Sequence, residues 1–151
     1  MTCSLVVNSK SGNTRMVSGA IKRALQAAGV EFVHAAALSD DADADQVALE
    51  AQGACAADTV LVGFWCDKGA CTPSVAALLS ALHGKRVDRK STRLNSMGPA
   101  VKQRYEAMLE QDPENARFKM LLDNWVAAKD HPTKEDLDNM AAAAKKAVLG
   151  E

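Results

Sequence analysis

The sequence lacks the features that mark secreted, membrane-spanning and zinc-binding chains. No run of apolar residues approaches the length of a membrane span, and the opening residues, Met1-Thr2-Cys3-Ser4, have neither the basic nor the apolar region of a signal peptide. The four cysteines form no Cys-x-x-Cys pair, which argues against zinc-ribbon and thioredoxin chemistry. We therefore expect a cytoplasmic protein with no metal site and no membrane anchor.

Charge and catalytic motifs are equally sparse. A net charge of -1 gives no general affinity for nucleic acid or membranes. Neither a Walker-type Gly-Lys-Ser/Thr nor a Gly-x-Gly-x-x-Gly pattern occurs, so the nucleotide-hydrolase and dinucleotide fingerprints both fail. No cysteine has the Cys-x5-Arg spacing of a low-molecular-weight phosphatase, and the three histidines are scattered. We predict no catalytic residue.

An acidic stretch follows the second predicted strand. It lacks the spacing of an EF-hand, so a solvated acidic face is favoured over a metal site. Such a face could instead steer a basic redox partner. Its carboxylates are Asp40, Asp41, Asp43 and Asp45.

What the sequence does contain is a regular alternation of apolar runs and helical patterns over 151 residues, which suits a single domain spanning residues 1–151. Strands are predicted at 5–7, 31–34 and 59–64, the last an uninterrupted apolar run that fits a strand covered on both faces. Helices are predicted between them. This spacing implies right-handed crossovers and a parallel α/β sheet with helices on both faces.

The most informative stretch follows the first strand and opens the first helix. A helix N-terminus offers unpaired N–H groups and partial positive charge, so it suits an anion, and phosphate is the expected one. Gly12 lets the backbone wrap closely, and the neighbouring side chains can donate hydrogen bonds to phosphate oxygens. The alternative is an ordinary strand-to-helix turn. The stretch reads Ser9, Lys10, Ser11, Gly12, Asn13 and Thr14.

This stretch resembles the phosphate loop of the flavodoxin family, Ser/Thr-x-Ser/Thr-Gly-x-Thr. The segment from Gly63 to Gly69, with Arg104-Tyr105-Glu106 and Met108-Leu109, looks like a small flavodoxin-like subfamily associated with bilirubin reduction. The resemblance covers 1–87 and 97–151. It implies a five-stranded sheet of order 2-1-3-4-5 and a non-covalent FMN that carries one or two electrons.

A second part of the site is expected in the loop after the third strand, because ligands of open α/β sheets lie beyond the carboxyl ends of the strands. Trp65 is a candidate to stack on the flavin, although it could equally be a core or interface tryptophan. Backbone groups of the loop could contact N5 of the flavin, with Gly69 permitting a peptide flip. The predicted contacts are Phe64, Trp65, Cys66, Asp67, Lys68 and Gly69.

The chain departs from the flavodoxin pattern after the third helix. Lys85-Arg86-Val87 should begin a fourth strand, but residues 88–96 show neither alternation nor an apolar run. Burying them in a central strand would leave charges unpaired, so we expect a solvated loop or a non-native segment. In flavodoxins a loop after the fourth strand forms the second wall of the flavin, and a helix and a fifth strand follow it; none of these is found between Val87 and Met97. The predicted sheet is therefore an incomplete 2-1-3-4, with weakened or absent FMN binding.

Beyond this segment the pattern is helical to the end, giving a helical C-terminal third. Thr133 and Asp136 resemble a capping box that opens the last helix. The sequence thus predicts an FMN-binding electron carrier that serves a redox partner protein, such as a reductase, rather than a self-contained enzyme. The alternatives are a cofactor-less α/β adaptor and a spliced remnant with impaired FMN binding.

Overall fold

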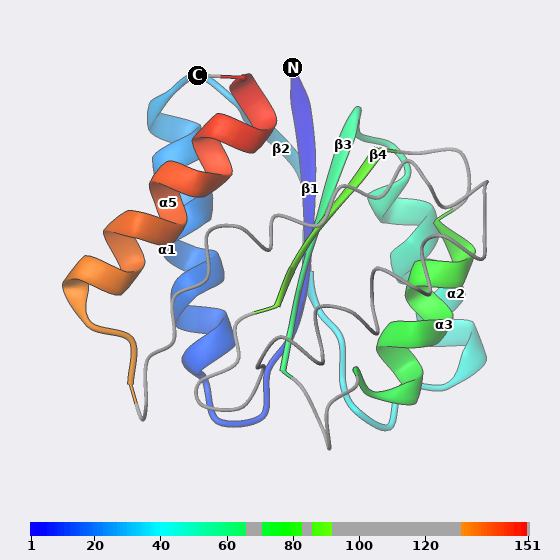
Figure 1. Ribbon diagram of the computed structural model, residues 1–151. Helices are drawn as coiled ribbons and strands as arrows, with labels where there is room; N and C mark the ends of the chain where they lie inside the picture. Colours follow the sequence, from blue (N-terminus) through cyan, green and yellow to red (C-terminus); the bar gives the residue numbers. More distant parts are fainter. Residues whose placement is uncertain (66–70, 83–85, 92–130, 151) are drawn as a thin grey trace, which may run out of the picture.

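A computed structural model describes residues 1–65, 71–82, 86–91 and 131–150. In these residues the chain forms a four-stranded parallel sheet of order β2-β1-β3-β4 (Figure 1). The strand order 2-1-3-4 predicted from the sequence is confirmed for the strands that lie in the described residues. The elements are β1 (Thr2–Asn8), α1 (Asn13–Ala27), β2 (Glu31–Ala37), α2 (Ala44–Ala54), β3 (Thr59–Phe64), α3 (Pro73–Ala81), β4 (Arg86–Ser91) and α5 (Lys134–Leu149).

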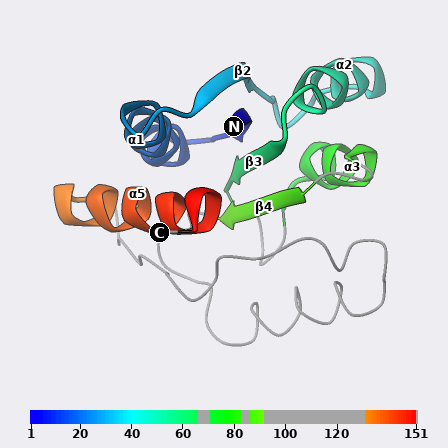
Figure 2. The same ribbon diagram turned by 90° about the horizontal axis from the view of Figure 1, so that it is seen from above.

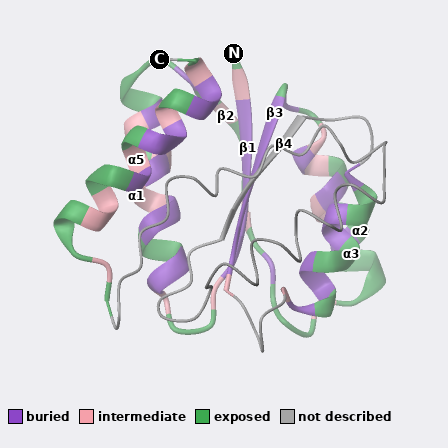
Figure 3. Cartoon of the chain, viewed as in Figure 1, coloured by how far each residue is buried: buried purple, intermediate pink, exposed green. Residues whose placement is uncertain are grey.

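Helices cover both faces of the sheet. Figure 2 shows α1 and α5 on one face and α2 and α3 on the other. Each face has its own apolar core: Val6 of β1 packs in the cluster with α2 and α3, whereas Leu5 and Val7 pack with α1 and α5. All six residues of β3 are buried, as the purple central strands of Figure 3 show. The prediction that this strand is covered on both faces is confirmed.

All four strands end at the same edge of the sheet, which we call the carboxyl edge. The pairings Asn8 with Phe64 and Val7 with Ala37 bring the ends of β1, β2 and β3 level. The N-termini of α1, α2 and α3 lie at this edge, at the bottom of Figure 1. The loops that follow the strands therefore meet there.

Residues at the helix ends adopt the capping arrangements that their sequence favours. Gly29, at φ 85°, follows the end of α1, and the Val30 N–H donates to the Leu25 carbonyl at 3.0 Å, which closes a Schellman motif. Thr72 precedes Pro73 at the first position of α3. Thr133 and Asp136 form the predicted capping box: Asp136 N–H donates to Thr133 Oγ1 at 3.1 Å and Thr133 N–H to Asp136 Oδ2 at 2.7 Å.

The fourth strand corrects one prediction. It begins at Arg86, as expected, but it continues through Ser91, where the sequence favoured a loop; Leu61 to Phe64 of β3 pair with Asp88 to Ser91. The prediction assumed a central strand. Among the described residues β4 is the last strand of the sheet, and edge strands commonly carry charged residues. Residues 92–96 and the helices predicted between 98 and 130 lie outside the described residues.

Among the helices that the structure describes, none is both long enough and apolar enough to cross a bilayer.

Candidate phosphate and ring site at the carboxyl edge

Residues 9–14, which we call the 9–14 loop, comprise the connection from β1 to α1 and the first two residues of α1, at the carboxyl edge. Gly12 is the N-cap of α1 and has φ 90° and ψ -10°, in the left-handed region. A Cβ built at Gly12 would meet nothing within 4 Å, so glycine is favoured here by the backbone conformation and not by lack of space. The sequence signal at this position therefore has a definite backbone cause.

The loop gathers its N–H groups around an oxygen. Ser9 Oγ accepts from Gly12 N–H at 3.1 Å and from Arg15 N–H at 3.4 Å. The Gly12 carbonyl accepts from Met16 N–H at 2.9 Å, which starts the helical ladder. Donors that converge on a hydroxyl oxygen at a helix N-terminus can also converge on a phosphate oxygen, because both are acceptors. The donor set present here fits a phosphate group.

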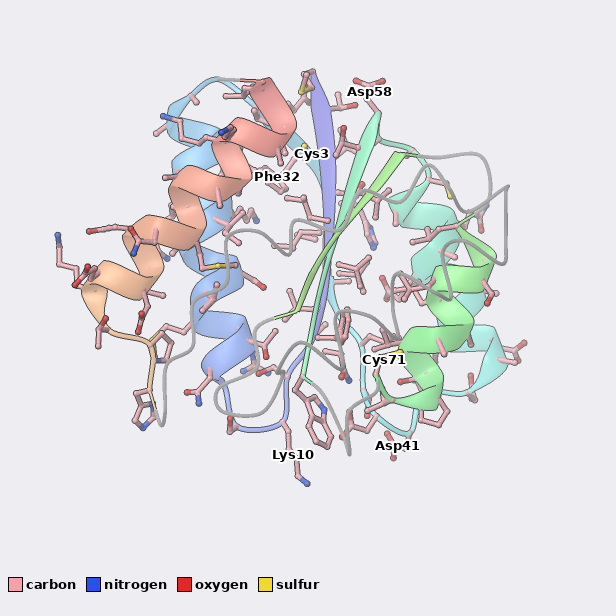
Figure 4. All side chains as sticks on the ribbon, in the orientation of Figure 1. Cys3, Lys10, Phe32, Asp41, Asp58 and Cys71 are labelled. Carbon is pink, nitrogen blue, oxygen red and sulfur yellow. The ribbon has the colours of Figure 1, made fainter. Side chains whose placement is uncertain are left out.

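The structure brings Trp65 to this loop, as the sequence predicted for the ends of adjacent strands. Trp65 directly follows β3, and its backbone N–H donates to the backbone carbonyl of Asn8 at 3.2 Å. The Lys10 ammonium lies over the indole, 4.7 Å from the ring centroid. Lys10 projects from the carboxyl edge, and Asp41 lies at the same edge in Figure 4. A phosphate donor set and an aromatic ring are thus adjacent.

Two polar residues at this edge were not singled out by the sequence as site residues. Asn8, at the end of β1, is 2% exposed, and its Nδ2 donates to Asp40 Oδ1 at 2.7 Å. The indole Nε1–H of Trp65 donates to the same carboxylate oxygen at 3.0 Å. Asp40 was predicted only as part of a solvated acidic face. The position of Asn8 directly after the predicted strand 5–7 is a signal that could have indicated it, whereas Asp40 lies six positions after the predicted strand 31–34 and has no such signal.

His131 is a further residue beside the 9–14 loop. Its Nδ1 lies 3.0 Å from Asn13 Oδ1, although the two residues are 118 positions apart. This hydrogen bond connects the segment before α5 to the first residue of α1. In the sequence His131 is one of three scattered histidines, and nothing local to it indicates a neighbour so distant in the chain.

The remaining predicted site residues are distributed differently. Phe64 is 1% exposed and belongs to the core beneath α2 and α3, so its ring is not presented at the carboxyl edge. Cys66, Asp67, Lys68 and Gly69 lie outside the described residues. Asp41, Asp43 and Asp45 are exposed, and no group of metal-ligating side chains was found within the ranges that the structure describes.

Comparison with known proteins points to one family. A family model described as a flavodoxin domain matches residues 4–93, more than half of the chain. No curated protein sequence matches. Among solved structures, flavodoxin 2 from Bacillus cereus in its oxidised form aligns with TM-score 0.65 and 19% identity, covering 100% of both chains.

Two other flavodoxin structures align similarly. One from the domain Archaea has TM-score 0.64 and 20% identity, covering 99% of this chain and 98% of its own. A short-chain flavodoxin associated with a non-canonical PDU bacterial microcompartment has TM-score 0.63 and 17% identity, with the same coverage. At these identities the structural likeness shows the fold alone.

Proposed function

The chain belongs to the flavodoxin family, and from that premise we propose that it is an electron carrier that binds FMN non-covalently at the carboxyl edge. The observation that carries the proposal is the convergence of the Gly12 and Arg15 N–H groups on Ser9 Oγ at the N-terminus of α1. A phosphate is the group that such donors select. The proposed electron transfer would leave this chain dependent on another protein for its electrons.

The residues of the edge have separable roles in this proposal. The N–H groups and hydroxyls of the 9–14 loop bind the phosphate, and Trp65 supplies one wall for the planar ring. The Lys10 ammonium contacts both regions, since it belongs to the loop and lies on the indole. The cofactor, when bound, supplies one-electron and two-electron chemistry. The 66–69 segment completes the ring site in the proposal.

The proposed partner is a redox protein such as a reductase, in the cytoplasm. Support comes from the exposed carboxylates at the carboxyl edge, among them Asp41 and Asp45, which complement a basic docking surface. We retain the cofactor-less adaptor as the alternative function. The two differ in a simple observation, because a protein that retains FMN during purification is yellow.

The experiment that tests the proposal compares FMN with riboflavin, which lacks the phosphate. We expect the purified chain to bind FMN more tightly than riboflavin. Gly12→Ala should reduce this preference roughly tenfold, because a non-glycine residue in the left-handed region costs about 1–2 kcal/mol, and relieving that strain moves the loop. The measurement is a pair of titrations followed by flavin fluorescence.

Gly29→Ala is the matched control. Gly29 has φ 85°, a Cβ there also meets nothing within 4 Å, and the residue lies at the opposite end of α1. Both variants should lose similar stability, but only Gly12→Ala should lose phosphate preference. Equal affinities for FMN and riboflavin in the unaltered protein would contradict the phosphate site. Absence of binding to either flavin would favour the adaptor.

A further inference from the structure

The clearest unassigned arrangement at the carboxyl edge is a carboxylate that is hydrogen-bonded to the indole N–H of Trp65. One oxygen, Asp40 Oδ1, accepts from Trp65 Nε1–H at 3.0 Å and from Asn8 Nδ2 at 2.7 Å. Asp40 lies in the link between β2 and α2, Asn8 ends β1, and Trp65 follows β3. Residues that end or follow three different strands therefore meet at a single oxygen atom.

Asn8, which donates to Asp40, is itself held in place by burial and by further hydrogen bonds. It is buried, and its Nδ2 also donates to the Leu38 carbonyl at 3.0 Å. Because Nδ2 donates to two acceptors, the orientation of the Asn8 side chain is defined. The backbone N–H of Trp65 donates to the backbone carbonyl of Asn8 at 3.2 Å, which fixes the end of the strand. Within the described residues, Asn8 Oδ1 is buried without a hydrogen-bond partner. An asparagine held so firmly can orient the carboxylate that it contacts.

The indole is thereby restrained at two places. Asp40 holds its N–H edge, and the Lys10 ammonium lies 4.7 Å from its centroid, over the ring face. A hydrogen bond to the ring edge fixes rotation about the last side-chain torsion, which is otherwise broad for an aromatic residue. The plane of the ring is then set before any ligand arrives, which reduces the entropy lost on binding.

We propose that Asp40 is a positioning residue that fixes the plane of Trp65 as a preformed wall for a flat aromatic ring system. The proposal rests on the proposed function, since the ring it serves is the flavin. It assigns to Asp40 a role distinct from that of the other acidic residues of the β2–α2 link. Asp41, one position further along, hydrogen-bonds the Ser39 hydroxyl and is exposed.

The test reads the indole directly in the ligand-free protein. Because the chain has two tryptophans, the variants are made in a Trp125→Phe background, so that the fluorescence reports Trp65 alone. Asp40→Ala should increase quenching of Trp65 by acrylamide and lower its steady-state anisotropy. Asp40→Asn keeps a carbonyl oxygen as acceptor and should behave like the background protein. Asp41→Ala removes a charge from the same link and should also leave both signals unchanged.

Ligand binding provides the second readout, with riboflavin as the probe because it has the ring system without the phosphate. Asp40→Ala should weaken riboflavin binding about two- to tenfold, the loss expected for one hydrogen bond. In a Trp65→Phe protein, which has no indole N–H, Asp40→Ala should have little further effect. Circular dichroism and thermal unfolding of each variant identify any that fails to fold, and Asp40→Asn then decides by its agreement with the background.

Two results would overturn the positioning role. One is an unchanged Trp65 quenching constant in a folded Asp40→Ala protein. The other is an equal loss of riboflavin affinity from Asp40→Ala with Trp65 and with Phe at that position, because Asp40 would then act by another route. If the background protein binds neither flavin, the proposed function fails, yet the quenching comparison still decides whether Asp40 holds the indole.

Discussion

At the scale of single residues, β3 packs closely against the part of α1 that lies next to the carboxyl edge. Gly63 of β3 faces α1, where a Cβ at this position would lie 2.6 Å from Ser18 Oγ and 3.4 Å from Thr14 Cγ2. Ser18 is 4% exposed and Thr14 2%, so neither has open space beside it. Thr14 belongs to the 9–14 loop. The glycine therefore lets the strand approach the helix that carries the proposed phosphate donors.

We predict that Gly63→Ala destabilises the protein by about 1–3 kcal/mol, the usual range for overpacking a core. Ser18→Ala removes the atom of closest approach and leaves Ser18 Cβ 3.9 Å from the new methyl, an ordinary contact. The double variant should therefore regain more than half of the lost stability. Urea denaturation of the two single variants and the double variant measures the coupling. Purely additive effects would show that the contact with Ser18 is not the cause.

At the scale of elements, the agreement between sequence and structure follows the strength of the local signal. β3 was predicted with its observed bounds because an uninterrupted apolar run has one interpretation between two turns. β2 was predicted too short, since it continues through Ala35 to Ala37, and alanine carries little strand preference. For β4 the sequence predicts an end at Val87, because the charged residues that follow are unfavourable in a central strand, but the strand continues to Ser91. The pairing of β4 with β3, and not the local sequence pattern, determines where this strand ends.

A capping box at the start of α2 was overlooked, although the sequence contains its pattern. Asp43 Oδ1 accepts from Gln46 N–H at 2.8 Å, and Gln46 Oε1 accepts from Asp43 N–H at 3.1 Å. Asp43 was predicted only as a member of the acidic face. The spacing of Asp43 and Gln46, a short polar cap residue with glutamine three positions later, was a sufficient signal. One of the four carboxylates therefore has a structural role.

We predict that Asp43→Ala destabilises the protein by about 1 kcal/mol, because two N–H groups at the start of α2 depend on this box. For a chain of this length the melting temperature should fall by roughly 2–4 °C. Asp43→Asn is the control: it removes the charge but keeps a good cap, so it should melt close to the unaltered protein. A similar loss in both variants would show that charge, not capping, is responsible.

The candidate site illustrates what sequence alone can supply at this scale. The 9–14 loop was predicted because its signal is contiguous, a strand followed by a hydroxyl-rich turn and a helix. Asn8 and Asp40 were not assigned to the site, and His131 was set aside, because their significance lies in contacts between segments far apart in the chain. The hydrogen bond between His131 and Asn13 is of this kind. Parallel topology predicts which strand ends meet, but not which side chains bond there.

At the scale of the whole molecule, charge is distributed unevenly relative to the fold. The chain has a net charge of only -1, yet the β2–α2 link and the first turn of α2 place four exposed carboxylates at the carboxyl edge, beside the proposed flavin site: Asp40, Asp41, Asp43 and Asp45. A local field of one sign can steer a partner of opposite charge even when the total charge is small. The orientation of docking would then bring the partner to the site itself.

We predict that electron transfer from the reduced, FMN-loaded protein to a small basic cytochrome slows as salt is raised, because the Debye length falls to about 10 Å near 0.1 M. Asp41→Lys, at the carboxyl edge, should lower the second-order rate constant at low salt by roughly three- to tenfold. Glu31→Lys makes the same charge change at an exposed residue that pairs with Thr2 at the opposite edge, and it should have a much smaller effect. Stopped-flow absorbance measures both. If the two variants slow the reaction equally, net charge alone governs the encounter and docking at the carboxyl edge is contradicted.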